Sequence, residues 1–334
     1  MRVRELNRGS EAEFVRYHEI YSAAEGFERP WAALRSLDDH RVDIHNADPG
    51  ERFLPLVAED GGTIVGAAAF YLPLSDNQKF AWLVPWVEPE RRGWGVGTAL
   101  LDSMVGMSRD ENRTDLVMEA PCPFDSTPDH PHRRFALKHG FSVANTEVHR
   151  LLDLPVPESL LDQLVAESAP HHRDYRIVVF DGPVPDELLQ SLCDTKNQLA
   201  VDAPTGDLDF EAERETPELH RHREETFRLQ GRVRLSTLAL APDNTVAAYS
   251  DLVIPKAPDA DVLQWGTLVR REHRGRRLGM AVKARNLKEL QARIGPERRH
   301  VTTANAEQNR WMVGINERLG FRPVENYLSL LRRL

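Results

Sequence analysis

Two stretches of the sequence combine arginine and glycine at a spacing that suits anion binding. In the first half, Arg92, Gly95 and Gly97 follow a hydrophobic run and precede an apolar helical pattern. Arg274 and Gly279 lie in a similar setting in the second half, each 182 residues after its counterpart. Glycines let a backbone approach an anion closely, and a helix start presents unpaired N–H groups with a partial positive charge. Each stretch therefore predicts a turn that cradles a phosphate group.

A second pair of matching segments indicates that a whole domain is repeated. Gly140-Phe141 follows the first turn and Gly320-Phe321 follows the second, with an offset of 180 residues. A chain of 334 residues is long enough for two domains of ordinary size. Prolines interrupt regular structure between the repeats. We expect an N-terminal domain over residues 1–155, a linker over 156–172 and a C-terminal domain over 173–334.

Each half predicts the same order of elements: strand, helix, hairpin, strand, phosphate turn with its helix, strand, short helix and closing strand. In the first half these elements are residues 2–6, 11–24, 53–58 with 63–71, 80–87, 98–105, 115–120, 132–138 and 146–154. In the second they are 175–180, 185–199, 232–240 with 245–254, 262–269, 277–293, 300–304, 309–319 and 327–331. The pattern predicts the α/β (α+β) class, with a mixed sheet flanked by helices in each of two tandem domains.

The overall composition limits the choice of partners. The formal net charge is −9, whereas nucleic acids and anionic membranes attract basic proteins. No apolar run reaches the length of a membrane span, and the chain has only two cysteines, Cys122 and Cys193. The histidines are not spaced like zinc ligands. We therefore expect a cytoplasmic protein, a monomer or homodimer, that binds no metal, nucleic acid or membrane.

The motifs resemble those of the GNAT superfamily of acyl-CoA-dependent N-acyltransferases. Its acyl-CoA motif, Arg/Gln-x-x-Gly-x-Gly/Ala, is matched from Arg92 to Gly97, and Arg274 to Gly279 is a variant with Arg277 in place of the first glycine. The segments 302–309 and 316–321 are similar to the family's closing motifs. A dinucleotide-binding turn is the alternative, but this turn does not open the first strand–helix unit and lacks the usual acidic partner.

The resemblance implies acetyl-CoA as co-substrate, with its pyrophosphate on the glycine turn and its pantetheine arm along the preceding strand. Carried over to this sequence, the implied cofactor-binding residues are Val87, Arg92, Gly93, Gly95, Gly97, Thr98, Val269, Arg274, Gly275, Arg277, Gly279, Met280, Asn305 and Asn309. Backbone amides do not depend on the side chain, so we expect the variant turn to bind only if Arg277 keeps a negative φ.

The resemblance also suggests which half is catalytic. In the family, a backbone N–H polarises the carbonyl of the thioester. The corresponding residue is Pro85 in the first half, which has no N–H, and Thr267 in the second half, which has one. Such a donor contributes a few kcal/mol in a transition state. We therefore expect catalysis in the C-terminal half. The family's usual tyrosine acid is absent from both halves, because those positions hold Ala136 and Asn316.

Replacements for the missing acid and base are sought in an acidic segment of the second half. This segment contains Asp207, Asp209, Glu211 and Glu213, and in the family it forms the lid on the acceptor side. Carboxylates there could bind a cationic amine and remove its proton, although a solvated acidic loop is the alternative. Asp251 is a further candidate base, and Tyr327 is a candidate acid.

The resemblance implies transfer of acetyl from acetyl-CoA to a primary amine of a small molecule by direct attack in a ternary complex. Two alternatives stay open: acetylation of a protein N-terminus or lysine, and a sensor or structural protein that binds acyl-CoA without turnover.

Overall fold

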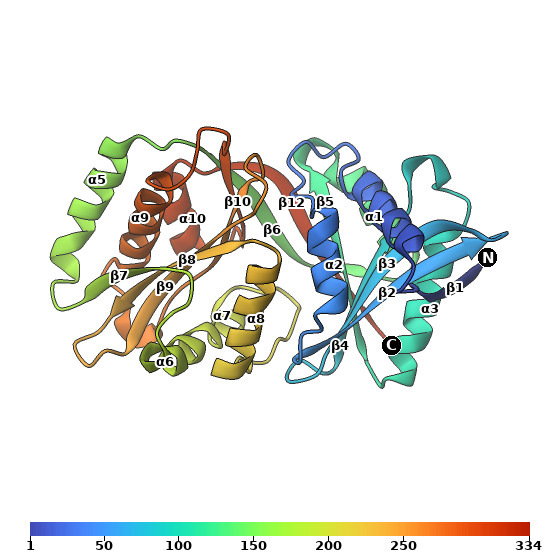
Figure 1. Cartoon of the computed structure of the whole chain (residues 1–334), viewed down its shortest axis with the longest axis horizontal. Helices are drawn as coiled ribbons and strands as arrows, with labels where there is room; N and C mark the ends of the chain where they lie inside the picture. Colours follow the sequence, from blue (N-terminus) through green and yellow to red (C-terminus); the bar gives the residue numbers. More distant parts are fainter. The chain divides into compact units, whose positions relative to one another are not determined.

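The computed structural model describes residues 1–334 and divides them into two compact units (Figure 1). Unit 1 comprises Met1–Asn145 together with Asn326–Leu334, and unit 2 comprises Thr146–Glu325. Each half of the chain therefore gives its closing strand to the other unit. Most of strand β6 (Ser142–Asp153) lies in unit 2, and most of strand β12 (Arg322–Arg333) lies in unit 1.

Unit 1 has a mixed sheet with the strand order β1-β2-β3-β4-β5-β12. Its other elements are β1 (Arg2–Glu5), α1 (Glu11–Glu25), α2 (Leu37–His45), β2 (Glu51–Asp60), β3 (Thr63–Pro73), β4 (Phe80–Trp86), α3 (Val96–Asp110), β5 (Asp115–Pro123) and α4 (Pro131–Lys138). Strands β2 and β3 form the hairpin that the turn residues Gly61 and Gly62 predict, since both adopt positive φ.

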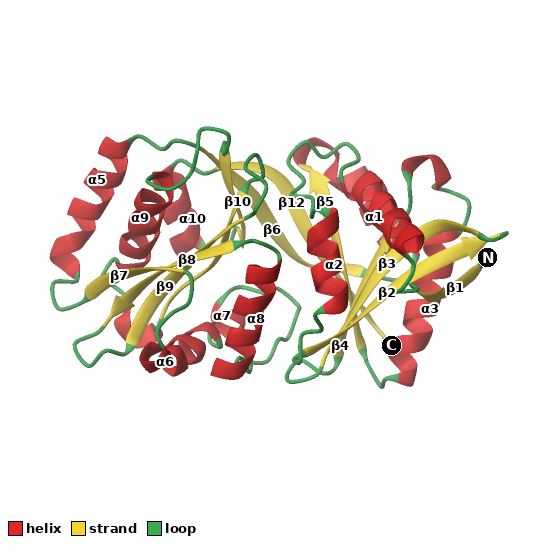
Figure 2. Ribbon diagram, viewed as in Figure 1, coloured by secondary structure: helices red, strands yellow, loops and turns green.

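Unit 2 has the corresponding order β6-β11-β10-β9-β8-β7. Its other elements are α5 (Glu158–Ser168), β7 (Arg176–Asp181), α6 (Asp186–Lys196), α7 (Leu199–Asp202), α8 (Pro217–Leu229), β8 (Val233–Leu240), β9 (Val246–Ile254), β10 (Val262–Val269), α9 (Leu278–Gln291), β11 (His300–Ala306) and α10 (Arg310–Leu319). Figure 2 shows helices around the strands of each unit, so the predicted fold class is confirmed. None of these helices has the length and apolar character that a membrane span requires.

Helices cover both faces of the sheet in unit 1, as the alternation of side chains along β3 shows. Ala68 and Phe70 face the core that α3 and α4 cover, whereas Ala67 and Ala69 face the core under α1 and α2. Successive residues of a strand point to opposite faces, so a strand that is apolar throughout is buried on both. All four residues are fully buried.

The central strands of each unit separate part of the way along. In unit 1, β4 pairs with β5 in parallel only from Phe80 to Trp82, although both strands continue further. In unit 2, β10 pairs with β11 only at Val262 and Leu263. The sheet of each unit is therefore splayed, and the gap opens next to the phosphate turn.

The predicted domain boundaries differ from the units. Unit 2 begins at Thr146, and the expected linker over 156–172 forms helix α5, whose Leu161 and Leu164 are buried in the core of unit 2. The prolines that suggested a linker stand at the ends of this helix, where proline is tolerated. Helices α2 and α8 were also missed, although Ser36 and Thr216 are regular N-caps that accept hydrogen bonds from backbone N–H groups.

Unit 2 contains a buried lysine where unit 1 has an apolar side chain. Lys283, on α9, is 1% exposed, and its Nζ donates a hydrogen bond to Oδ1 of Asn316 over 2.7 Å. The repeat offsets place Leu101 and Ala136 at these two positions in unit 1, where both belong to the core. Burial lowers the pKa of Lys283 to about 7, because the apolar surroundings disfavour the ammonium.

The exchange of closing strands predicts that unit 1 cannot fold without the C-terminal residues. Leu328 and Leu330 of β12 are buried in its core, and loss of a buried leucine side chain typically costs about 2–5 kcal/mol. A fragment of residues 1–155 should therefore show no cooperative unfolding transition by circular dichroism. Joining residues 326–334 to residue 145 through a flexible linker should restore the transition. Cooperative unfolding of the bare fragment would contradict the exchange.

Burial of Lys283 predicts a pH-dependent stability. The unfolded chain holds this proton up to the ordinary lysine pKa, whereas the folded chain releases it near pH 7, so the unfolded state binds more protons between these values. The free energy of unfolding should rise from this group by roughly 1.4 kcal/mol per pH unit above pH 7.5. Urea unfolding between pH 7 and 9.5 should show a smaller slope for Lys283→Met. The matched change Lys288→Met, at a half-exposed position of the same helix, should leave the slope unaltered.

Candidate active site

The phosphate turn of unit 1 has the geometry of an anion cradle. Gly93 and Gly95 adopt left-handed φ values of 83° and 84°, and Gly95 is the N-cap of α3. The first intrahelical hydrogen bond runs from Ala99 N to Gly95 O. The amides of residues 96–98 therefore have no acceptor within the helix and are available to an anion. Added Cβ atoms at Gly93 and Gly95 would meet no neighbour, so glycine is favoured at these positions for its positive φ and not for space.

A cavity of about 760 Å³ extends from this turn through unit 1. Its walls are the turn, the ends of β4 and β5, and helix α4. All six residues that the resemblance implied for the first half line it: Val87, Arg92, Gly93, Gly95, Gly97 and Thr98. Gly97 is needed for space, because a Cβ there would lie 3.3 Å from the ring of Phe135. The cavity occupies the gap that opens where β4 separates from β5.

Two carboxylates line the cavity away from the phosphate turn. Glu25, at the end of α1, accepts hydrogen bonds from Trp86 Nε1 over 2.9 Å and from Arg29 Nη1 over 2.6 Å. Glu119, on β5, accepts a hydrogen bond from the hydroxyl of Tyr327 over 3.1 Å. The Glu119 carboxylate and burial together raise the pKa of Tyr327 well above its ordinary value. Tyr327 therefore stays protonated and holds Glu119, although it comes from the far end of the chain.

His132 also lines the cavity, so the histidines are not all surface residues. Burial, together with the nearby His130 and Arg92, lowers its pKa to about 4, although a hydrogen bond to the Pro121 carbonyl opposes this shift. His132 is therefore neutral at pH 7, with one ring nitrogen donating to Pro121 and the other able to accept. Sequence reasoning missed it because nothing local marks the start of α4 as a cavity wall.

The phosphate turn of unit 2 keeps the backbone shape without the glycine. Arg277 is the N-cap of α9, with φ 52° and ψ 21°, the left-handed conformation that Gly95 has in unit 1. The condition that Arg277 must keep a negative φ for the turn to bind is therefore not met, and it was mistaken as a condition, because the left-handed residue is itself part of the turn in both units. Such a conformation costs roughly 1–2 kcal/mol for a residue with a Cβ. Its side chain gains a hydrogen bond from Nη1 to the carbonyl of Glu167, at the end of α5.

The arginines of this second turn are already paired with a carboxylate. Asp202, at the end of α7, accepts a hydrogen bond from Arg271 Nε over 2.6 Å and another from Arg274 Nη2 over 2.7 Å. Its side chain is only 2% exposed. In unit 1 the guanidinium of Arg92 lies instead over the ring of Phe27, 4.7 Å from the centroid. The two turns therefore differ in charge although their backbones are alike.

The remaining residues predicted for unit 2 are spread over its core and surface. Val269 and Met280 belong to the apolar core, Gly275 has a left-handed φ, and Gly279 lies against Ile315 of α10. Thr267 is buried, and its hydroxyl shares a hydrogen bond with Ser250 over 3.1 Å. Asp207, Asp209 and Glu211 are exposed and Glu213 is half-buried, on the segment between α7 and α8. The structure brings none of these four together with Thr267 in a described cavity.

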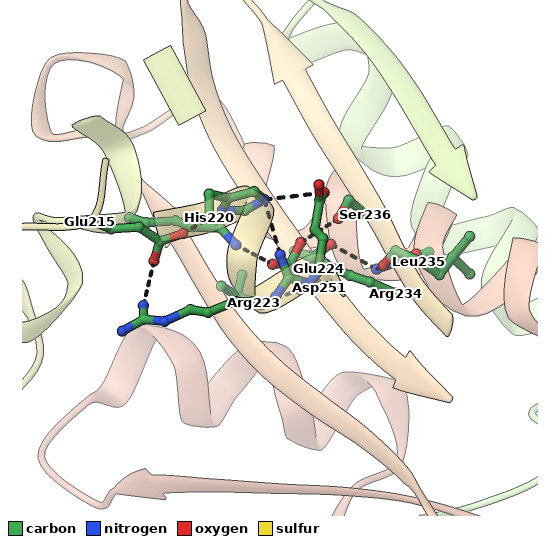
Figure 3. A network of polar contacts seen from close by, with 12 residues as sticks. Glu215, His220, Arg223, Glu224, Arg234, Leu235, Ser236 and Asp251 are labelled. Atoms are coloured by element: carbon green, nitrogen blue, oxygen red, sulfur yellow. Dashed lines mark hydrogen bonds and ion pairs between the residues drawn. The ribbon is translucent and has the colours of Figure 1, made fainter. Parts of the chain in front are cut away.

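Asp251 belongs to a buried polar network in unit 2 (Figure 3). It accepts hydrogen bonds from Lys196 Nζ over 2.7 Å and from the hydroxyl of Ser236 over 2.8 Å. Burial alone would raise the pKa of Asp251, but the ammonium of Lys196 and the guanidinium of Arg234 hold it below its ordinary value. The carboxylate is thus paired with a cation inside the core, which makes it a weak base.

The same network contains three side chains with the types of metal ligands. Ligand atoms of Cys193, Glu215 and His220 lie within 4.8 Å of one another, and all three residues are buried. However, Glu215 is hydrogen-bonded to His220 and also to Arg223 Nη1 over 3.0 Å, and Arg234 Nη1 lies 3.0 Å from His220 Nε2 (Figure 3). Guanidinium groups already neutralise the carboxylate, so the cluster fits an ion-paired core better than a cation site.

Unit 2 lacks a counterpart of the Glu119–Tyr327 pair. Asp115 pairs with Phe80 in unit 1, and Val301 pairs with the corresponding residue, Val262, in unit 2. Asp115 and Val301 are therefore equivalent, and four residues further along these strands Glu119 is equivalent to Asn305. Asn305 Oδ1 accepts hydrogen bonds from Asn316 and Arg150, and its partner on β6 is Val148. An amide is neither a base nor an acid at neutral pH. The other predicted asparagine, Asn309, caps α10 by accepting a hydrogen bond from Met312 N.

Comparisons with known proteins agree with this geometry. Residues 14–141 match the acetyltransferase (GNAT) family. A tandem GNAT protein from the clavulanic acid biosynthesis pathway superposes with a TM-score of 0.80 at 26% identity, covering 99% of this chain and 98% of that chain. A GCN5-related N-acetyltransferase from Sphaerobacter thermophilus has a TM-score of 0.64 at 15% identity, covering 99% and 95%. The latter likeness concerns the fold alone. The sequence matches no curated protein.

The glycine at the cavity wall allows a direct test of where acetyl-CoA binds. Gly97→Val should weaken binding at least tenfold by titration calorimetry, because the new side chain would fill the space beside Phe135. Gly106→Val is the matched control, since it lies on the same helix and an added Cβ there meets no neighbour. Equal losses in both variants would mean that valine disturbs the helix and not the cavity.

Proposed function

Since residues 14–141 match the GNAT acetyltransferase family and the whole chain superposes on a tandem GNAT protein, we propose that it transfers acetyl from acetyl-CoA to a primary amine of a small molecule, and that unit 1 is the catalytic unit. The amine attacks the thioester directly while both substrates are bound. One observation carries this proposal: a single cavity joins the phosphate turn of unit 1 to the carboxylates of Glu25 and Glu119.

The residues around the cavity fit acetyl-CoA as a substrate. The amides at the start of α3 suit its pyrophosphate, and Arg92 adds a positive charge at the same end. The gap between β4 and β5 suits the pantetheine arm, because the edges of the separated strands lie there. Gly97 keeps the passage between Val87 and Phe135 open. Acetyl-CoA bound in this way would place its thioester toward Glu25 and Glu119.

The two carboxylates suit a cationic amine. Glu25 and Glu119 would attract an ammonium group, and Glu119 would take one proton from it to give the neutral amine that attacks the acetyl carbon. The C–S bond of the resulting tetrahedral intermediate then breaks, and CoA leaves as a thiolate that takes up the second proton released by the nitrogen. Tyr327 is assigned as a positioning residue, because its hydroxyl holds the Glu119 carboxylate. Trp86 and Arg29 hold Glu25 in the same manner.

This proposal moves catalysis away from the C-terminal half, where the sequence placed it. That expectation rested on the N–H of Thr267 and on carboxylates of unit 2. In favour of unit 1, the position of Glu119 holds Asn305 in unit 2, and Asp251 is paired with Lys196. Pro85 cannot polarise the thioester, so we expect transfer in unit 1 to depend strongly on its acid–base groups.

Substitution of Glu119 tests the proposal. With an amine found by following thiol release from acetyl-CoA, Glu119→Gln should lower kcat/KM for the amine by about 100-fold or more, since general bases typically contribute this much. Its Kd for acetyl-CoA should stay within twofold of the unaltered protein. Tyr327→Phe should lower kcat less and shift the acidic limb of the pH–rate profile, because Glu119 loses a hydrogen bond that favours its charged form.

The matched control is Asp207→Asn, which removes an exposed carboxylate of unit 2. It should leave the kinetics unchanged. If Asp207→Asn abolished turnover while Glu119→Gln preserved it, catalysis would belong to the C-terminal unit.

A further inference from the structure

The second phosphate turn carries an internal anion that the first turn lacks. The carboxylate of Asp202 bonds Arg271 through one oxygen and Arg274 through the other. Two guanidinium groups on the two oxygens of one carboxylate are the arrangement that arginines also make with phosphate oxygens. Arg92, the counterpart of Arg274, has an aromatic ring as its neighbour and lines an open cavity.

Asp202 is fixed in this place by the elements around it. It ends the short helix α7, whose Leu199 packs against the apolar core of unit 2. The adjoining Arg270 is held as well, because its Nε donates to Thr195 Oγ1 over 2.8 Å and its Nη2 to the Ser191 carbonyl, both on α6. The ends of α6 and α7 therefore hold the basic segment 270–274 from one side.

A pyrophosphate at this turn would meet two obstacles. It would have to take Arg271 and Arg274, whose side chains are 66% and 50% exposed, from a carboxylate that is only 2% exposed. This exchange is costly because the Asp202 charge would be left buried without a partner. If Asp202 stayed in place, the like charges would repel at close range. Glu272, 3.9 Å from Arg270, adds a further negative charge to the same segment.

We propose that Asp202 closes the phosphate turn of unit 2 to acyl-CoA, so that each chain binds one acyl-CoA molecule, in unit 1. Asp202 is thus a specificity-determining residue that decides which of the two turns accepts the nucleotide end of the substrate. The inference concerns unit 2 and does not depend on which amine unit 1 acetylates. It also explains how two turns with the same backbone conformation can differ in use.

Calorimetric titration with acetyl-CoA counts the sites. The unaltered chain should bind one molecule, and Asp202→Asn should bind two, with affinity at the second site raised at least 100-fold. In a background of Gly97→Val, the one site should be at least tenfold weaker, and adding Asp202→Asn should restore one site of ordinary affinity. Asp207→Asn removes the same charge from an exposed position nearby in sequence and should leave one site.

Two outcomes would overturn the proposal. One is two sites of similar affinity on the unaltered chain, a result that does not depend on any variant folding. The other is a folded Asp202→Asn protein, with a normal circular dichroism spectrum and Tm, that gains no site.

If Asp202→Asn failed to fold, the double variant Arg271→Gln with Arg274→Gln would replace it. These changes should leave the affinity for acetyl-CoA within twofold of the unaltered chain, and a larger loss of affinity would contradict the proposal. Binding of acetyl-CoA by neither the unaltered chain nor Asp202→Asn would reject this proposal together with the proposed function.

Discussion

The separation of β4 from β5 is the constraint on which the candidate site depends. Two parallel strands that stop pairing leave backbone N–H and C=O groups along both edges, and such groups need partners. A substrate with amide groups in an extended arm can supply them. The same separation makes room for the cavity, whose walls the phosphate turn and α4 complete. The exchanged strand β12 pairs with the opposite edge of β5 and brings Tyr327 to Glu119.

The two units show how one backbone can carry different chemistry. Both have a splayed sheet and a phosphate turn with a left-handed residue before the helix. Side chains account for the differences: Glu119 against Asn305, Leu101 against Lys283, and an Arg92 that stacks on Phe27 and lines the cavity against an Arg274 that Asp202 holds. Unit 2 has buried ion pairs such as Asp251 with Lys196, whereas unit 1 has the cavity. Ion-paired cores of this kind add little stability, and their cost is offset only when every charge has a partner.

Local patterns were enough to predict much of the fold. Gly95 and Gly97 after a hydrophobic strand predicted the phosphate turn, and Gly61 with Gly62 predicted the hairpin, because each depends on neighbouring residues alone. The pairing of Tyr327 with Glu119 could not be found in this way, since the two residues are 208 positions apart. The contact between Asp202 and Arg274 spans 72 positions and depends equally on the packing of distant elements. The prediction of a linker was wrong for a related reason. Its prolines stand at the two ends of helix α5, which is stabilised by packing against the core of unit 2.

The central claim is that acetyl-CoA occupies unit 1. Hydrogen–deuterium exchange on the full chain, with and without acetyl-CoA, locates the bound molecule without any substitution. The account predicts slower exchange of the amides of Gly93, Gly95, Gly97 and Thr98 and of residues 118–120, all of which line the cavity, and unchanged exchange at residues 275–280. Protection confined to residues 275–280 would place the substrate in unit 2 and contradict the account.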